Sequence, residues 1–301
     1  MTSLKALLPL AVLLLLSVAP TETTVVKMIE KCVKIFVKGN PPNIAGILEG
    51  ANILDQNRYK PICQTFRNTR TFVTLYDTKN KIPVFSAGKY IGDHEGKRPK
   101  PSPWMIEPQL EDTKGDNSMA PENNQETYKN QAVKKDYENK LGYDKGHLFP
   151  CCYGFNQIVK TSTFTLTNIV PQNINFNGGT WKNMEQCIKC VMDHYCSNKE
   201  AYVVTGALHS TGKTLNNRVN IPSMLWSAFC CYNSEKKQWL ASAFWGKNTE
   251  PESNYLDIKT LGSLHKELGI EVFPETECPS DTTVATVYPD LYSKCNCKDK
   301  A

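Results

Sequence analysis

The sequence of 301 residues lacks several features that would place it in a specialised class of protein. It contains no Asn-x-Ser/Thr tripeptide, so N-linked glycans are not expected. After the first residues, no stretch approaches the ~20 consecutive apolar residues of a membrane-spanning helix, so no stable membrane span is expected. No segment repeats along the chain, which argues against a repeat architecture. The composition, 40% hydrophobic and 22% charged, is that of an ordinary globular domain.

The longest apolar run lies at the N-terminus, over residues 6–16. Lys5 precedes it and Ser17-Val18-Ala19 follows it, which is typical of a secretory signal peptide. We expect residues 1–24 to be removed and the protein to be secreted; a retained signal anchor is the alternative. Residues 25–301 are then expected to form a single domain, with a cysteine-containing N-terminal segment and a short C-terminal tail. The net charge of +5 suits a polyanionic partner without demanding one.

All 12 cysteines follow the predicted signal peptide, at positions 32, 63, 151, 152, 187, 190, 196, 230, 231, 278, 295 and 297. A high, even number behind a signal peptide predicts disulfide bonds, whose pairing the sequence does not give. The neighbours 151–152 and 230–231 are expected to bond to different partners, because a bond between adjacent cysteines is strained. The alternative is a zinc site, since Cys187, Cys190, His194 and Cys196 have ligand-like spacing.

Strand-like segments dominate the chain and helices are inserted between them, which predicts an α+β fold. Strands are expected at 71–78, 82–87, 201–208, 224–232 and 238–245. Pro83 places the second of these strands at an edge or a bulge. Helical spacing appears at 25–36 and at 256–268, where Gly269 ends the pattern. Residues 93–129 contain five prolines and are expected to form a long, irregular surface excursion.

The most informative segment is residues 143–185, where three motifs follow one another. Asp144-Lys145-Gly146-His147 comes first, an alternating Thr/Phe/Leu run over 163–168 comes second, and Asn177-Gly178-Gly179-Thr180-Trp181 comes last. We interpret this order as a strand, a long connection, a second strand and a helix. A histidine then ends the first strand, and an asparagine stands where the helix begins.

These residue types suit the hydrolysis of a phosphodiester around one hard metal ion. His147 can accept a proton from water, because an imidazole is mostly neutral at pH 7. Asn177 offers a carbonyl oxygen, which suits Mg²⁺ because that ion keeps most of its waters. Glu185 can accept from a metal-bound water, Lys189 can neutralise phosphate charge, and Gly146 can let the substrate backbone approach.

Each residue taken alone also has a purely structural interpretation. A single histidine in a strand is usually structural, and an asparagine before Gly-Gly is often a turn or a helix cap. Glu185 and Lys189, four residues apart, can form a surface ion pair of little energetic weight. Lys145 can simply be solvated.

Asp144-Lys145-Gly146-His147 resembles the Asp-Arg-Gly-His motif of the DNA/RNA non-specific endonucleases, which are nucleases of the ββα-metal or His-Me finger type. The blocks at 167–172 and 177–181 match the family's next motifs in order. The resemblance covers roughly residues 30–275 and is specific in combination. It implies a ββα-metal fold with a mainly antiparallel sheet flanked by helices, and cleavage of DNA and/or RNA.

The resemblance also implies roles for individual residues. His147 would be the general base, Asn177 the direct ligand of Mg²⁺ (with Mn²⁺ as a substitute), and Glu185 a holder of metal-bound waters. Lys145 and Lys189 stand where the family has arginines, and Tyr76 stands where many relatives have another. These departures motivate a second hypothesis, a secreted nucleic-acid-binding protein without turnover. A disulfide-rich structural protein with neither activity is a third.

Basic residues at 58–70 are candidates for phosphate contacts with the substrate, because they would form a positively charged rim beside the first strands. They are Arg58, Arg67 and Arg70.

Overall fold

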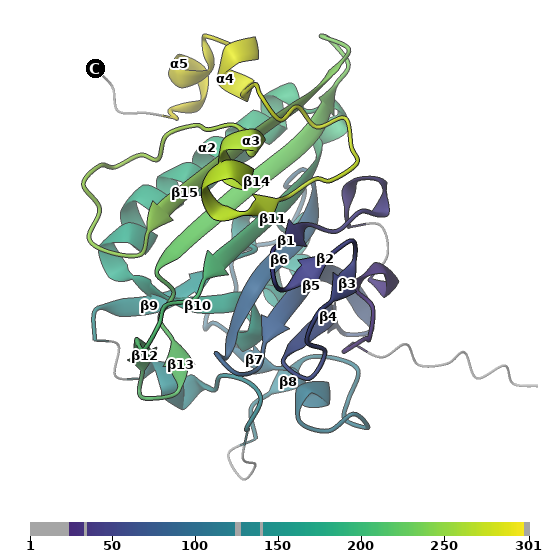
Figure 1. Cartoon of the computed structure of the whole chain (residues 1–301), viewed down its shortest axis with the longest axis vertical. Coiled ribbons are helices and arrows are strands. Elements are labelled where there is room, and N and C mark those ends of the chain that lie inside the picture. The colour runs from purple at the N-terminus through teal and green to yellow at the C-terminus, as the bar shows by residue number, and fades with distance from the viewer. Residues whose placement is uncertain (1–23, 33–34, 124–127, 139–140, 298–301) are drawn as a thin grey trace, which may run out of the picture.

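The computed structural model describes residues 24–32, 35–123, 128–138 and 141–297, which are organised around a six-stranded antiparallel sheet (Figure 1). The strand order is β15-β14-β11-β6-β5-β4. Its strands are β4 (Tyr59–Phe66), β5 (Thr69–Asp77), β6 (Ile82–Ile91), β11 (Glu200–Leu208), β14 (Met224–Asn233) and β15 (Gln238–Lys247). The five strands predicted from apolar and β-branched runs are therefore confirmed, and β4 completes the sheet at its edge.

Both faces of the sheet are covered, which gives the molecule two hydrophobic cores. On one face lie α1 (Gln157–Ser162), α2 (Lys182–Tyr195) and the strand pair β9 (Tyr143–His147) and β10 (Ile169–Asn173). On the other face lie the N-terminal segment, a small sheet of order β16-β1-β2-β3, and α3 (Leu261–Leu268). Figure 1 shows α3 in front of the sheet and α2 behind it.

The remaining elements are short. The strands of the small sheet are β1 (Asn43–Ile44), β2 (Leu48–Glu49), β3 (Asn52–Ile53) and β16 (Ile270–Glu271), and two further pairs are β7 (Met105–Ile106) with β8 (Ala120–Pro121) and β12 (Thr214–Leu215) with β13 (Val219–Asn220). The helices α4 (Val284–Val287) and α5 (Leu291–Cys295) form the C-terminal tail. None of the helices among these residues is long and apolar enough to cross a membrane.

The predicted order of strand, connection, strand and helix is confirmed, but the second strand begins later than expected. β10 starts at Ile169, and the alternating run before it forms a buried 3₁₀ turn over Leu166–Asn168. The alternation misled because residues 163–168 are buried on every side. Hydrogen bonds satisfy their hydroxyls: Thr163 donates to the Lys160 carbonyl at 2.8 Å, and the Thr165 and Thr167 hydroxyls pair at 3.1 Å. Alternation of apolar and polar residues indicates a strand only where one face of that strand is exposed to solvent.

Three smaller predictions come out differently. No regular helix covers the described part of 25–36, which holds only a 3₁₀ turn at Ile29–Lys31. Positions 33–34 lie outside the described residues, as does the segment 1–23 of the predicted signal peptide. Pro83 faces a register shift between Leu75 and Tyr76, so the predicted bulge is confirmed, but β6 is an inner strand and not an edge. The helix predicted at 256–268 is shorter, and Gly269 ends it at a φ of 69°, as expected.

Five disulfides form, which confirms the main prediction from the cysteine count. They are Cys32–Cys63, Cys187–Cys297, Cys190–Cys295, Cys196–Cys231 and Cys230–Cys278. Two of them attach the C-terminal tail to α2. The expectation for Cys151 and Cys152 was wrong, because both are free thiols. The other ten cysteines already pair among themselves, and a bond between two neighbours is strained.

Gly146 shows how tightly β9 packs on β10. A Cβ at this position would lie 2.1 Å from Oε1 and 2.6 Å from Cβ of the buried Gln172. The absence of a side chain is therefore needed inside the fold, which replaces the earlier interpretation that Gly146 clears space for substrate.

We predict that Gly146→Ala lowers the free energy of unfolding by about 1–3 kcal/mol, the usual range for overpacking a tight contact. Thermal or urea unfolding of the purified variant measures this. Gly178→Ala is the matched control, since no described atom lies within 4 Å of a Cβ there. Equal stability of the two variants would contradict the packing argument.

Candidate active site

His147 is presented by a turn that one buried amide holds. Leu148 donates its backbone N–H to the Asn168 carbonyl at 2.9 Å, and Phe149 donates to Asn168 Oδ1 at 3.0 Å. Asn168 Nδ2 donates to the carbonyls of Phe149 at 2.9 Å and Thr163 at 3.0 Å. Because Asn168 is fully buried, these bonds do not compete with water, and the backbone directly after His147 is fixed.

The imidazole of His147 is enclosed by aromatic rings. Its centroid lies 4.9 Å from the Phe164 ring and 5.4 Å from the Trp104 ring. The residue is 8% exposed, and its Nε2 has no hydrogen-bond partner among the described residues. Burial, aided by the positive charge of Arg98, lowers the pKa of His147 to about 3. The ring is therefore neutral at physiological pH and has a lone pair available.

Asn177 lies in a wide turn of π-helix, Phe176–Trp181, that runs directly into α2. Turns of π-helix are rare in proteins, and those that occur are often found at functional sites. Asn173 Oδ1 caps the start of the turn by accepting from the backbone N–H groups of Asn175 and Phe176, both at 3.0 Å. The segment 250–254 holds its outer side, because Thr180 donates to the Ser253 carbonyl at 2.5 Å. Side-chain hydrogen bonds thus hold the turn that carries Asn177 at the start of α2, where the sequence predicted it.

His147 and Asn177 line the same pocket. The residues around it are Arg98, Lys145, His147, Pro150, Cys151, Cys152, Asn177, Gly178, Lys182, Glu185 and Gln186. Three of them are cationic and one is a carboxylate. The structure therefore brings together four of the residues expected at the site from the sequence: Lys145, His147, Asn177 and Glu185.

Glu185 lines this pocket from the first turn of α2. Burial raises the pKa of Glu185 to about 8, and the charge of Arg98 opposes this only in part. The side chain is therefore held in a site where a negative charge is poorly solvated. A cation bound beside it would stabilise the ionised form.

Arg98 is the residue that sequence reasoning missed. It is the only arginine in the excursion over 93–129, and α1 fixes its position. Gln157 clamps the preceding residue, because it accepts from the Lys97 N–H at 3.0 Å and donates to the Lys97 carbonyl at 3.1 Å. The buried Lys160 donates to Asp93 at 2.5 Å and to the Gly96 carbonyl at 2.9 Å. A lone arginine in a proline-rich stretch was the available signal, and it was too weak to use.

The two lysines named from the sequence have different surroundings. Lys145 lines the pocket, with its ammonium 5.6 Å from the Trp104 ring centroid and 5.3 Å from that of Tyr137. Lys189 donates to Asp193 at 2.9 Å and lies 4.0 Å from Asp93. The described residues that line the pocket do not include Lys189, and no ion pair between Lys189 and Glu185 occurs in the described part of the chain.

The arginines proposed as a basic rim lie apart from the pocket. Arg58 holds Asp77 with two bonds of 2.9 and 2.6 Å, Arg70 donates to the Lys31 carbonyl at 2.9 Å, and Arg67 stacks on Phe66. None of the three is among the described residues around His147. Their role as substrate contacts stays a prediction.

Tyr76 is not among the described residues that line the pocket. It is fully buried, and its hydroxyl accepts the Ala132 N–H at 3.1 Å. The interpretation that Tyr76 replaces an arginine of the relatives, and that one phosphate contact is missing, stays a prediction. Arg98 supplies a guanidinium to the pocket from a different segment.

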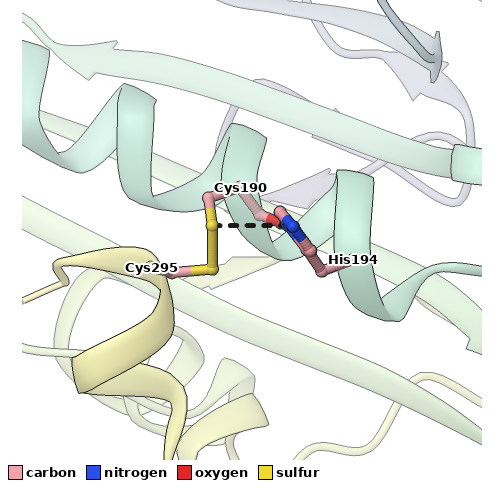
Figure 2. Close-up of side chains that lie close together, drawn as sticks. All are labelled: Cys190, His194 and Cys295. Atoms are coloured by element: carbon pink, nitrogen blue, oxygen red, sulfur yellow. Dashed lines mark hydrogen bonds between the residues drawn. A yellow bond between two sulfur atoms is a disulfide. The ribbon is translucent and has the colours of Figure 1, made fainter.

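The zinc alternative fails on its ligand set. Cys187 is bonded to Cys297, Cys190 to Cys295 and Cys196 to Cys231, so three of the four expected ligands are in disulfides. Cys190 is bonded to Cys295 beside His194, as Figure 2 shows. In this oxidised state the sulfurs are not thiolate ligands.

Two antiparallel strands followed by a helix, with a histidine at the end of the first strand and an asparagine at the helix entrance, define the ββα-metal class of nuclease fold. The comparison with protein families agrees with this geometry: the model of the DNA/RNA non-specific endonuclease family matches residues 50–263. The chain belongs to this family.

Relatives with similar sequences are named as endonucleases or nucleases. The chain is 28% identical over 221 residues to the Endonuclease domain-containing 1 protein of Homo sapiens and 30% identical over 208 residues to that of Mus musculus. The alignments cover 67% of this chain but only 39% and 38% of those proteins, so the chain spans less than half the length of the curated relatives it matches. A nuclease of Nostoc sp. is 34% identical over 86 residues, 28% of this chain and 30% of that protein.

A solved structure shares the fold at lower sequence identity. It is a chain of the crystal structure titled as the EndoG/EndoGI complex, with a TM-score of 0.54 and 18% identity over 73% of this chain and 90% of that one. The similarity supports the arrangement of strands and helices.

We predict that the metal-free protein loses stability as pH rises from about 5 to 8, in part because of Glu185. Its pKa is about 8 in the folded state, whereas an unfolded glutamate titrates near ~4.3, so between these values the folded state binds more protons than the unfolded state. Urea unfolding with EDTA at pH 5 and pH 8 measures the loss. It should be smaller in Glu185→Gln and unchanged in Glu267→Gln, an exposed position on α3. Identical losses in all three proteins would refute the assignment.

Proposed function

We propose that the chain is a secreted, metal-dependent, sequence-nonspecific endonuclease that hydrolyses phosphodiester bonds of DNA and/or RNA. The observation that carries the proposal is the pairing of two unlike groups in one pocket. His147 Nε2 is buried with no hydrogen-bond partner in the described part of the chain, and His147 lines the same cationic pocket as Asn177. Secretion is part of the proposal and rests on the predicted signal peptide at 1–24. The single domain expected over residues 25–301 is part of it as well.

His147 is the general base in this mechanism. Its neutral ring accepts the proton of an attacking water at Nε2, which Phe164 and Trp104 hold in position. Arg98 contributes to the low pKa of the free enzyme, so a phosphate that neutralises Arg98 raises the basicity of the imidazole when substrate binds. Substrate binding thus strengthens the base at the moment it is needed.

The residues around the pocket fit a hard dication such as Mg²⁺, with Mn²⁺ as a substitute. Asn177 offers an amide oxygen, and Glu185 offers a partly buried carboxyl group whose raised pKa a bound cation would lower. When bound, the ion would stabilise negative charge on the phosphate and on the departing 3′ oxygen. Asn177 would hold it directly, and Glu185 would accept hydrogen bonds from its waters.

Cationic side chains around the pocket would orient the scissile phosphate. Arg98, Lys145 and Lys182 line it, and none of these contacts requires a particular base. Lys145 is steadied by two aromatic rings, which compensates for the flexibility that a lysine has at a position where the family carries an arginine. Lys189 is paired with Asp193 and does not line the pocket. In this mechanism it contributes positive charge near the phosphate without contacting it.

A plasmid-nicking assay on the purified protein tests the proposal. Relaxation of supercoiled DNA with Mg²⁺, abolished by EDTA and restored by excess Mg²⁺, is the expected result. A shift of DNA mobility without nicking under every metal condition would favour the alternative, a binding protein on the same scaffold.

We predict that His147→Ala lowers the nicking rate by about 10²–10⁴-fold, the usual contribution of a general base. His209→Ala is the control, because His209 is exposed and lies beside a separate pocket formed by Trp226 and Ile44. The circular dichroism spectrum should be unchanged in both. A folded His147→Ala protein that nicks as fast as the parent would remove the base from the mechanism.

Arg98→Ala is predicted to lower kcat/KM roughly tenfold to a hundredfold, since a charge-assisted contact is worth about 1.5–3 kcal/mol. Arg67→Ala, which removes an exposed arginine stacked on Phe66, should change kcat/KM less than twofold. Steady-state rates on a short labelled duplex at several salt concentrations give both values. The opposite ranking would place the substrate on the rim near β4 and away from the His147 pocket.

A further inference from the structure

Three metal-binding atoms lie together on the outer side of α2, away from the residues assigned to catalysis. Cys190 Sγ, Cys295 Sγ and His194 Nδ1 are all within 4.8 Å of one another. Cys190 and His194 are one helical turn apart on α2, and Cys295 ends α5 of the tail. Figure 2 shows the imidazole turned toward the sulfur of Cys190.

The separation between Cys190 Sγ and His194 Nδ1 matches that of two ligands on one zinc ion, whereas the two sulfurs are bonded to each other. With Zn–S near ~2.3 Å and Zn–N near ~2.0–2.1 Å, two ligands of a tetrahedral zinc lie roughly 3.5–3.8 Å apart. His194 Nδ1 is 3.5 Å from Cys190 Sγ, which is within this range. Nδ1 also donates to the Cys190 carbonyl at 2.9 Å, because a carbonyl oxygen can only accept. Coordination therefore requires that the bond between the two sulfurs is broken and that Nδ1 gives up this hydrogen bond.

We propose that reduction of the Cys190–Cys295 disulfide converts this cluster into a Zn²⁺ site formed by two thiolates and one imidazole. A water would complete the tetrahedron. The site is distinct from the Mg²⁺ site proposed above and from the four-ligand zinc motif suggested by the sequence, because it uses Cys295 from the tail in place of Cys187 and Cys196.

The second disulfide between the same elements keeps the ligands together after reduction. Cys187 and Cys297 are 2% and 3% exposed, whereas Cys190 is partly accessible, so a reductant reaches Cys190 first. With Cys187–Cys297 intact, residue 295 stays two positions from a covalent anchor on α2. Leu291 of α5, fully buried, holds the tail helix in the core as well.

A dithiol reductant supplies the two electrons that reduction of the Cys190–Cys295 disulfide requires. One thiolate of the dithiol attacks a sulfur of the Cys190–Cys295 bond, the second thiol closes the cyclic disulfide of the reductant, and two protons and two electrons pass to the protein sulfurs. Zinc binding then displaces the two thiol protons, and neutral His194 binds through Nδ1 in the tautomer that carries its proton on Nε2.

The test compares zinc binding to the oxidised and the selectively reduced full chain. The protein is treated with limiting dithiothreitol, the reductant is removed by gel filtration, and mass mapping of alkylated peptides confirms that only Cys190 and Cys295 were reduced. Zinc is then titrated against a chromogenic chelator. One additional Zn²⁺ per chain is expected in the reduced protein. Cys151 and Cys152 are free in both samples, so their contribution cancels.

The variant His194→Ala keeps every disulfide and so avoids a folding defect. Its reduced form should bind zinc at least about tenfold more weakly than the reduced parent, since even outer partners of a zinc site are worth about 10–100-fold. His265→Ala, at a position in the last turn of α3, is the matched control and should bind like the parent. Equal zinc binding by oxidised and reduced protein, or by reduced His194→Ala and reduced parent, would overturn the proposal.

Discussion

The buried amide of Asn168 is the constraint on which the site depends. Two of its three hydrogen bonds join Phe149, after His147, to the segment before β10, and the third, to the Thr163 carbonyl, holds that segment itself. One side chain therefore fixes the end of β9 beside the start of β10. Without it, two backbone carbonyls and one N–H would be buried without partners, each at a cost of about 1–3 kcal/mol. The enclosed position of His147, and therefore its low pKa, follows from this turn.

Neutral amides hold the other half of the pocket in the same way. Asn173 caps the π-helical turn that carries Asn177, and Gln157 clamps the backbone beside Arg98. Asn248 ties β10 to the segment after β15, because it accepts from the Asn173 N–H and donates to the Pro171 carbonyl. In the pocket itself, Arg98, Lys145 and Lys182 lie around the carboxyl group of Glu185 and the neutral His147.

The sequence predicted the parts of this arrangement that are local. His147 and Asn177 could be predicted because short sequence motifs indicate the strand end and the helix entrance that carry them. The strands β11, β14 and β15 could be predicted because each is a continuous, largely apolar run. Arg98 was missed because a long loop has no periodicity, and its place depends on contacts with α1 that are distant in sequence. Gly146 was assigned to substrate approach, since the side chain of Gln172 that fills the space comes from the paired strand.

The account requires that the ion and the base meet in one pocket, and a crystal of the protein soaked in Mn²⁺ measures this directly. The anomalous signal of manganese should give a peak within coordination distance of Asn177 Oδ1, on the side of the pocket that faces His147. A peak elsewhere on the molecule, with none beside Asn177 at saturating Mn²⁺, would contradict the central claim.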